Sequence, residues 1–461
     1  MRSRIKIIVV VIVLVGLFLS YSTINQALYT ATGFSAKNIC SGHFISGFSS
    51  QIVFEEALVP VSKTFQFVTA EVDNQDQFVT TNILGAYSRK AVYKQGIGCV
   101  LLPPEQSESE FEFTQFSHQP ESPNKPWPFG LAEVSDNSNF LDVKRIIAED
   151  FVSINSPNEK RTKALLVAYK GVLIAEHYSD GINKQTPLLS WSMAKSITNI
   201  QVGLLVNDGL LSLADSPAIP GWDSKEYQSI SLEHLLTMSS GLEFNETYGI
   251  GSDAALMLSV APRADVYARN KKIIHKPGKH WSYSSGTTNI LSGIIKSQFS
   301  TNFQGYYEYI HQRLFRPMGI TSAQLEMDSG GTLIGSSYMY ATARDWAKIG
   351  QLLLQKGKWK DQQLLSEEWI NFSTTPVNSD PKNQYGAQFW LNRDPDDQRL
   401  QRKWPSIPED AFYMSGFQGQ HVVVIPSMQL VFVRLGYTTP GHSTDIEQIM
   451  KDVISVLQLA K

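Results

Sequence analysis

The sequence predicts an α+β fold, in which both ends of a large domain form an antiparallel sheet and a mostly helical region is inserted between them. Three observations predict it. Strand–turn–strand patterns occupy residues 164–178 and 422–435, and residues 200–384 between them are richer in helical patterns. Because two hairpins far apart in the chain must bury their apolar faces, we expect them to share one sheet with helices against it.

Each hairpin consists of two apolar runs joined by a short turn. Runs 164–169 and 172–178 flank Lys170-Gly171, and runs 422–425 and 430–435 flank Pro426-Ser427-Met428-Gln429. Alternation and β-branched residues favour strands, and these short connections favour antiparallel neighbours.

Helical spacing marks the end of the chain and part of its middle. Apolar residues recur every three or four positions near the C-terminus, at Ile446, Ile449, Val453 and Leu457. A comparable pattern covers 345–354. Both segments are predicted to be amphipathic helices.

Composition limits the classes of function. A chain of 461 residues is too long for one simple core, so a catalytic region with an appendage is expected. The net charge of −3 and the lack of a long basic block argue against a nucleic-acid partner. The nine histidines form no H-E-x-x-H motif, and there is no glycine-rich phosphate loop, so neither metal nor cofactor is expected.

The N-terminal segment, residues 1–36, is predicted to be a signal peptide or a membrane anchor. Arg2, Arg4 and Lys6 precede an apolar run at 7–19, and no further charge appears before residue 37. No A-x-A cleavage site is evident, which favours an uncleaved anchor with a periplasmic or extracellular catalytic domain. A buried core helix is the alternative.

Residues 37–125 are predicted to form an N-terminal extension that ends in a proline-rich linker, followed by the main domain at 126–461. The runs 51–54 and 65–68 look β-like. Cys40 and Cys99 are the only cysteines in the chain. In an oxidising compartment they could form a disulfide, but two separate thiols are an open alternative.

The segment around Ser192 is the candidate nucleophile site. Ser192 and Lys195 form S-x-x-K, and the helical pattern after them ends at Asp208-Gly209. Ser192 is therefore predicted at a helix start, with Lys195 on the same face and able to accept the hydroxyl proton. Free N–H groups at a helix start also favour a developing oxyanion. The alternative is an N-capping serine followed by a solvated lysine.

Two further segments could complete a catalytic centre. Tyr283 and Ser285 form Y-x-S on a loop that enters a helix, where the phenol could relay a proton to a leaving group. Ser415 and Gly416 lie at a glycine-rich strand entry, where a backbone N–H could be the second oxyanion donor beside that of Ser192. The alternatives are a packed interface tyrosine and an ordinary β-bulge.

These three segments, in this order, resemble the class C β-lactamase-like serine hydrolases, which include penicillin-binding peptidases, esterases and 6-aminohexanoate-dimer hydrolases. The resemblance covers roughly residues 130–461 and looks closest to the 6-aminohexanoate-dimer hydrolase and esterase branch. It implies a penicillin-binding-protein-like fold, with Ser192 as the acylated nucleophile, Lys195 as general base and Tyr283 as proton relay. It also implies that Phe417 donates the second oxyanion N–H, beside substrate-binding Ser285, Ser415 and Gly416.

Two departures from the family pattern bear on the substrate. Tyr283-Ser284-Ser285 replaces Y-A-N, and Met414-Ser415-Gly416 replaces K-T-G, whose lysine lies near the carboxylate of a β-lactam. The resemblance therefore implies a small ester or amide substrate. A β-lactamase or D,D-peptidase, and a non-catalytic binding protein of the same fold, are the alternatives.

Overall fold

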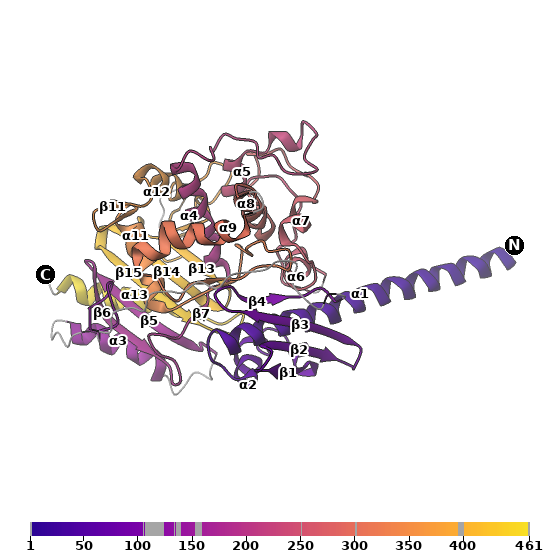
Figure 1. Ribbon diagram of the computed structural model, residues 1–461, viewed down its shortest axis with the longest axis horizontal. Coiled ribbons are helices and arrows are strands. Elements are labelled where there is room, and N and C mark those ends of the chain that lie inside the picture. The colour runs from indigo at the N-terminus through magenta and orange to yellow at the C-terminus, as the bar shows by residue number, and fades with distance from the viewer. Residues whose placement is uncertain are drawn as a thin grey trace.

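The centre of the molecule is a six-stranded antiparallel sheet in the order β12-β13-β14-β15-β5-β6 (Figure 1). The computed structural model describes residues 2–104, 106, 124–132, 134, 140–152, 159–249, 251–299, 302–394 and 401–459, with side chains from residue 23 onward. The strands are β5 Thr162–Tyr169, β6 Val172–Tyr178, β12 Trp390–Leu391, β13 Phe412–Gly416, β14 Gln420–Ile425 and β15 Leu430–Gly436. Both predicted hairpins are present, and pairing between β15 and β5 joins them, which confirms the α+β prediction.

The central sheet is buried on both faces. In β14, Val422 packs into one apolar cluster and Val423 into another, and the same alternation runs along β5 and β15. Helices α3 Leu141–Val152 and α13 Ile446–Leu459 cover the second face, while α11 Ala343–Leu354 covers the first. Successive side chains of a strand point to opposite faces, so each of these strands contributes to two cores.

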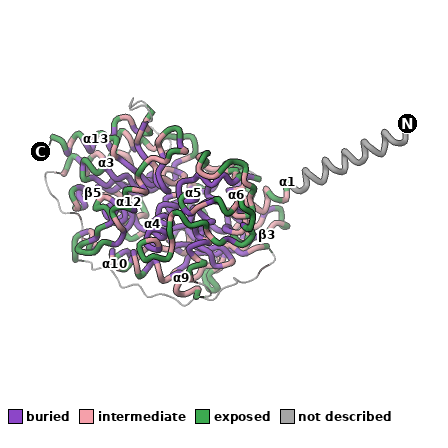
Figure 2. The backbone as a smooth tube through the Cα atoms, turned by 90° about the horizontal axis from the view of Figure 1, so that it is seen from above, coloured by how far each residue is buried: buried purple, intermediate pink, exposed green. Residues whose placement is uncertain are grey.

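A mostly helical region lies over the first face. It includes α4 Ala194–Asn207, α5 Leu232–Leu236, α6 Asp253–Ser259, α7 Ala264–Arg269, α8 Ser285–Ser297, α9 Phe303–Ile310, the π-helix η6 His311–Phe315, α10 Arg316–Met318 and α12 Glu367–Ser373. Short strands β7 Leu188–Leu189, β8 Gln324–Leu325 and β9 Met339–Ala341 form a second sheet, and β10 Lys358–Trp359 pairs with β11 Gln362–Gln363. Figure 2 shows α4 running through the buried interior.

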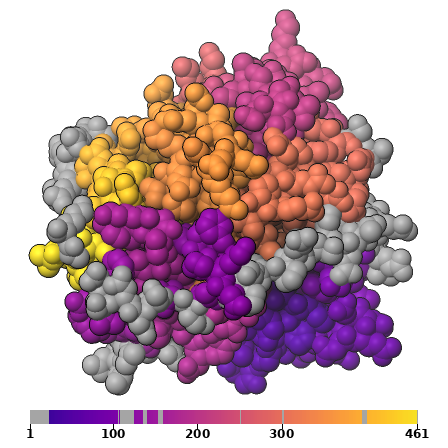
Figure 3. Space-filling model, turned by 60° about the vertical axis from the view of Figure 1, so that its left-hand side comes forward, coloured from indigo at the N-terminus to yellow at the C-terminus, as the bar shows by residue number. Residues whose placement is uncertain are grey.

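The N-terminal segment is part of the same packed body. Helix α1 Arg2–Phe44 passes the predicted boundary at residue 36 without a break and packs on the four-stranded meander β1-β2-β3-β4. Those strands are β1 Thr69–Asp73, β2 Phe78–Ile83, β3 Tyr87–Lys94 and β4 Gly98–Leu101. In Figure 3 this indigo segment forms one corner of the molecule, and its buried side chains belong to the main hydrophobic cluster.

The two β-like runs of the extension were predicted wrongly. Residues 51–54 lie in α2 Ser50–Ile52 and the π-helix η1 Val53–Leu58, and residues 65–68 overlap the 3₁₀-helix η2 Lys63–Phe67. Ser49 and Ser62 each accept a backbone N–H at the start of these turns. Such caps satisfy backbone donors locally and favour helical turns over a short apolar alternation.

The apolar run at 7–19, on which the anchor prediction rests, lies outside the residues whose side chains are described. In the part of the chain whose side chains are described, no helix has the length and apolar character needed to cross a membrane. Most of the proline-rich linker predicted at the end of the extension is also outside the described residues. Just after it, the buried Trp127 indole donates a hydrogen bond to the Arg344 carbonyl.

Two buried cross-links connect the N-terminal segment to the rest of the protein. Cys40 of α1 forms a disulfide with Cys99 of β4, with a Cα–Cα separation of 6.0 Å. Beside it, Lys37 Nζ lies 3.0 Å from Glu326 Oε2, and both side chains are fully buried. Glu326 also accepts hydrogen bonds from the Ser41 hydroxyl, at 2.7 Å, and the Cys99 N–H, at 2.5 Å. The carboxylate of the catalytic domain therefore binds two elements of the extension.

We predict that Lys37→Met lowers the free energy of unfolding by about 3–5 kcal/mol, because it leaves the Glu326 charge buried without its cation. Burial already raises the pKa of Glu326 and lowers that of Lys37. The double variant Lys37→Met/Glu326→Gln, which removes both charges, should recover much of the loss. Urea denaturation measures all three proteins.

Lys63→Met, which changes an exposed lysine, is the matched control and should stay within roughly 0.5 kcal/mol of the wild type. Equal losses for the single and double variants would show that the ion pair itself, not an unpaired charge, determines the effect.

Candidate active site

Ser192 lies where the chain enters the interior. The 3₁₀ turn Trp191–Met193 leads directly into α4, so the predicted helix start is present. Ser192 is partly exposed, whereas both of its neighbours are buried. Trp191 adopts φ of +48°, which is strained for a bulky residue and costs on the order of 1–3 kcal/mol. This sharp turn presents the Ser192 hydroxyl on the surface of an otherwise buried segment.

Lys195 lies one turn after Ser192 and is only 1% exposed. Its Nζ is 3.1 Å from Ser192 Oγ, 2.9 Å from Ser285 Oγ and 2.9 Å from the Ser336 carbonyl oxygen. Burial lowers the pKa of Lys195 to about 8, and the negative charge of Glu246 opposes this shift. Roughly a tenth of the amine is therefore neutral at pH 7, far more than at the usual lysine pKa, and the neutral form is the one that a general base requires.

The hydrogen bonds of Lys195 determine where its lone pair points. The Ser336 carbonyl can only accept, so one N–H of the amine is directed there. Ser285 donates its hydroxyl hydrogen to Glu246 Oε1 at 2.6 Å, so toward Lys195 it accepts. When Lys195 loses a proton, the remaining position faces Ser192. The neutral amine is thereby oriented to take the Ser192 proton.

Glu246 is a site residue that the sequence analysis did not identify. It accepts from the Ser285 backbone N–H at 2.7 Å and from the Ser285 hydroxyl. Ser285 begins α8, and a carboxylate at a helix start is favoured by the helix dipole. Glu246 therefore fixes the rotamer of Ser285 and through it the donor pattern of Lys195. It stands in an irregular loop with no motif around it, so no sequence signal indicated its role.

Tyr283 lies beside both Lys195 and Ser192. The Lys195 amine is 4.9 Å from the centre of its ring, whose other neighbours are Tyr385, at 5.9 Å, and Trp390, at 5.3 Å. Burial raises the pKa of Tyr283 well above its usual value, and the neighbouring Ser192 hydroxyl opposes that rise. The phenol therefore stays protonated beside the nucleophile.

Tyr248 is the second residue that sequence reasoning missed. Its side chain is 40% exposed, and its hydroxyl donates to Glu246 Oε1 at 3.4 Å. Burial of this hydroxyl raises its pKa. The ring stacks on Phe417 at 5.6 Å between centroids. Tyr248 therefore lies between Glu246 and Phe417, two residues of the active site.

The glycine-rich segment is brought against the nucleophile turn. A Cβ on Gly416 would lie 2.1 Å from the Ser190 carbonyl oxygen, so only glycine allows this approach. Phe417 follows directly, and its ring contacts Trp191 at 5.7 Å between centroids. Ser415 is partly exposed at the same end of β13. Hence the glycine-rich segment around Gly416 lies beside the nucleophile turn, as the sequence analysis predicted.

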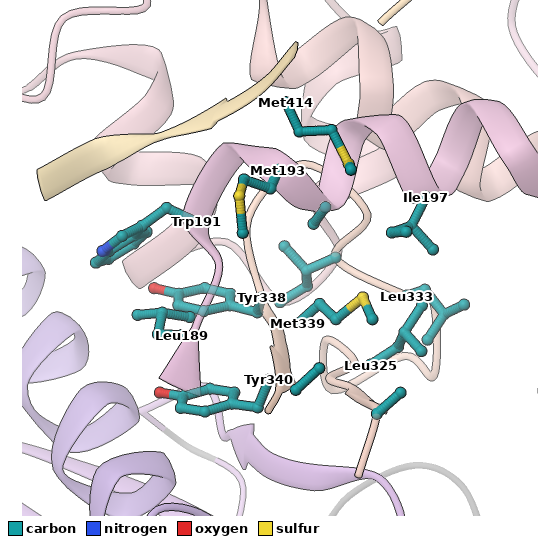
Figure 4. Packing of buried hydrophobic residues seen from close by; sticks show 14 of the residues in the cluster. Leu189, Trp191, Met193, Ile197, Leu325, Leu333, Tyr338, Met339, Tyr340 and Met414 are labelled. Carbon is teal, nitrogen blue, oxygen red and sulfur yellow. The ribbon is translucent and has the colours of Figure 1, made fainter. Parts of the chain in front are cut away.

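Met414 points away from this surface. It is 1% exposed, and Figure 4 shows it among packed hydrophobic side chains that include Met193 and Trp191. The position that corresponds to the family's K-T-G lysine therefore carries no charge and is part of the core.

All predicted catalytic and substrate-binding residues thus meet at one place, together with Glu246, Tyr248 and Ser336. The backbone N–H of Ser336 donates to Asn289 Oδ1 at 3.3 Å, and this hydrogen bond holds in place the carbonyl that binds Lys195.

Among the described side chains, no group of three or more histidine, cysteine, aspartate or glutamate residues is arranged to hold a metal ion.

The antiparallel sheet, its helical covering and the S-x-x-K turn define a domain of the penicillin-binding-protein and β-lactamase class. The chain belongs to the Beta-lactamase family, which matches residues 159–453. This match covers the sheet, the helical region and every predicted site residue of the main domain, and it leaves out the N-terminal segment.

Individual relatives agree with this assignment. The chain is 22% identical over 310 residues to a 6-aminohexanoate-dimer hydrolase from Paenarthrobacter ureafaciens, covering 59% of this chain and 78% of that protein. A Bacillus anthracis structure named for the same hydrolase has a TM-score of 0.55 at 21% identity and covers 66% of this chain and 80% of its own. An octameric penicillin-binding protein homologue from Pyrococcus abyssi has a TM-score of 0.52 at 18% identity, with 69% and 77% covered. The structural matches show a shared fold.

We predict that kcat/KM for an activated ester rises with pH through an apparent pKa near 8, because only deprotonated Lys195 can accept the Ser192 proton. Glu246→Gln removes the negative charge that raises the pKa of Lys195. The rising limb of the pH profile should therefore move to lower pH. Steady-state kinetics between pH 5 and 10 measure the shift.

Glu243→Gln is the matched control, since Glu243 is an exposed carboxylate in the same loop, and its limb should stay in place. A limb that moved to higher pH in Glu246→Gln, or did not move, would contradict the assigned electrostatic role.

Proposed function

We propose that this protein is a serine hydrolase that cleaves ester or amide bonds through an acyl-enzyme on Ser192. The observation that carries the proposal is the donor pattern of Lys195, whose other two contacts leave its lone pair for Ser192. A structural lysine would be solvated or paired with a carboxylate in direct contact. This one is buried against three neutral oxygen atoms, an environment that favours its neutral form.

In the proposed acylation, Ser192 Oγ attacks the substrate carbonyl carbon while Lys195 accepts the hydroxyl proton. The carbonyl π electrons move to oxygen, and the N–H groups of Ser192 and Phe417 stabilise the resulting oxyanion. The oxyanion then collapses, the bond to the leaving group breaks, and the alcohol or amine departs with the proton that Lys195 passes on through the adjacent protonated phenol of Tyr283. Water next attacks the ester carbonyl of the acyl-enzyme and gives a proton to Lys195. The bond to Ser192 Oγ breaks, Lys195 returns the proton to Oγ, and the acid is released.

The surroundings favour an uncharged substrate. Trp191, Tyr248, Tyr283 and Phe417 present aromatic rings around Ser192. The K-T-G lysine position is the buried Met414, so this strand offers no cation to a substrate carboxylate. Simple esters and linear amides therefore fit better than anionic β-lactams, which places a β-lactamase or D,D-peptidase second.

The cross-link between Cys40 and Cys99 supports the further proposal that the protein acts outside the cytoplasm. Disulfides persist mainly in oxidising compartments such as the periplasm. This agrees with the export predicted from the basic and apolar start of the chain, either as a signal peptide or as an anchor.

A fluorophosphonate label with peptide mapping tests the nucleophile directly. We expect the phosphonyl group on Ser192, and Ser192→Ala should abolish labelling and lower ester turnover by several powers of ten, to about the background rate. Ser190→Ala, two residues earlier, is the control and should retain labelling. Labelling that persists in Ser192→Ala would exclude Ser192 as the nucleophile, and no labelling of the wild type would favour the binding-protein alternative.

We also predict that kcat/KM for a short-chain p-nitrophenyl ester exceeds that for a cephalosporin. Loss of one charged hydrogen bond to the β-lactam carboxylate costs on the order of 2–3 kcal/mol, roughly 30- to 150-fold in binding. Met414→Lys is unsuitable as a test because that position is buried. The direct comparison on the wild-type protein suffices, and a higher value for the cephalosporin would refute the proposed substrate class.

A further inference from the structure

A cavity of about 410 Å³ lies between the N-terminal segment and the nucleophile. Helix α1 contributes Ala27, Ala31 and Phe34 to its wall, and the turn at residues 61–65 contributes Phe65. The opposite wall is formed by Trp191, Tyr248 and Phe417, which are residues of the active site. Its volume is within the range of pockets that bind small ligands.

The cavity adjoins the active site. Trp191 is the residue before Ser192, and the Tyr248 hydroxyl donates to Glu246, whose carboxylate binds the Ser285 hydroxyl that contacts Lys195. Phe34 stacks on Trp191 at 5.8 Å between centroids and on Phe65 at 5.4 Å, so one wall continues from the nucleophile turn into the N-terminal segment. A substrate bound at Ser192 can therefore extend directly between the catalytic domain and α1.

The lining is uncharged. None of the described residues that line the cavity is Asp, Glu, Lys, Arg or His, and their polar side chains are mainly the hydroxyl groups of serine, threonine and tyrosine. A carboxylate or ammonium group placed there would lose its hydration without gaining a counter-ion. A linear hydrocarbon chain would instead bury apolar surface against alanine, leucine and aromatic side chains.

The position of Tyr283 indicates which part of the substrate enters. Tyr283, proposed to protonate the leaving group, contacts Tyr385 and Trp390, and none of these three residues lines the cavity. Phe417, proposed to bind the carbonyl oxygen, lines it. The leaving group is therefore directed to the Tyr283 side, and the acyl chain to the cavity.

We propose that this cavity binds the acyl chain of the substrate, and that the protein is selective for esters or amides of medium-length aliphatic acids. This inference rests on the proposed acyl-enzyme mechanism at Ser192. It gives the N-terminal segment, which lies outside the family match, a direct part in substrate recognition.

The wild-type protein tests the proposal with p-nitrophenyl acetate, butyrate, hexanoate and octanoate. Each buried CH₂ should raise kcat/KM by about fourfold, until the cavity is filled. A value that is flat or falls from acetate to octanoate would overturn the acyl-chain site while leaving the hydrolase proposal intact. Absence of Ser192-dependent turnover of every ester would instead reject the hydrolase proposal.

Octyl acetate tests the opposite placement of the chain, because its eight-carbon chain is on the alcohol and not on the acid. A gain over ethyl acetate that matched or exceeded the gain in the acyl series would place the chain on the leaving-group side and overturn the assignment. We expect no comparable gain.

A variant whose larger side chain fills the cavity tests the acyl-chain site independently. Ala27→Trp introduces an indole at a partly exposed position of the cavity wall, and it should lower the octanoate-to-acetate ratio of kcat/KM by about tenfold or more. Gln26→Trp, at the exposed neighbouring position outside the lining, should leave the ratio unchanged. Thermal unfolding confirms that both variants are folded, and equal ratios in the two would contradict the proposal.

Discussion

The burial of the Lys195 amine against three oxygen atoms is the constraint on which the catalytic arrangement depends. Burial without a direct carboxylate partner lowers the pKa of this amine to about 8, and its geometry leaves one position for Ser192. Several separate segments must converge for this to hold. The S-x-x-K turn supplies the pair, the start of α8 supplies Ser285, and Asn289 holds the Ser336 carbonyl in place.

Glu246 raises the pKa of Lys195 without contacting its amine, because Ser285 lies between them. Its carboxylate contacts Ser285 rather than Lys195, so it orients the hydrogen bond and raises the amine pKa without forming a direct ion pair. A direct pair would hold the lysine charged and remove its lone pair. The Ser285 hydroxyl therefore keeps the Glu246 carboxylate away from the Lys195 amine. This separation matters for the base function of Lys195 as much as the charge of Glu246 does.

The N-terminal segment stabilises the strained turn as well as the fold. The Trp191 indole donates to Gln418 Oε1 at 3.2 Å, and the Gln418 amide donates to the Ala57 carbonyl at 3.2 Å. Phe34 stacks on the same indole. With the disulfide and the Lys37–Glu326 pair, these contacts make the extension a structural part of the active-site surroundings. Its removal would expose Trp191 and open the cavity to water.

Local sequence patterns determined the elements of the main domain. Alternating apolar residues specify the hairpins at β5–β6 and β14–β15, and spacing along the chain specifies α13 and the pairing of Ser192 with Lys195 on one helical turn. The Y-x-S pattern indicated Tyr283, and the family resemblance added Phe417. The structure places Tyr283 beside Lys195 and Phe417 against Trp191, the residue before Ser192. In the extension, the same reasoning failed at 51–54 and 65–68, where serine caps decide the local conformation.

Only the tertiary structure identified the residues that depend on contacts distant in the chain. Glu246 acts through Ser285, 39 residues later, and Ser336 binds Lys195 across 141 residues. Neither position carries a motif, because a carbonyl or a carboxylate at the right place can come from any loop. The disulfide, the buried Lys37–Glu326 pair and the apolar cavity likewise required the packing of α1 on the catalytic domain. The sequence alone determined which groups can react, whereas the folded environment determined their protonation and the space around them.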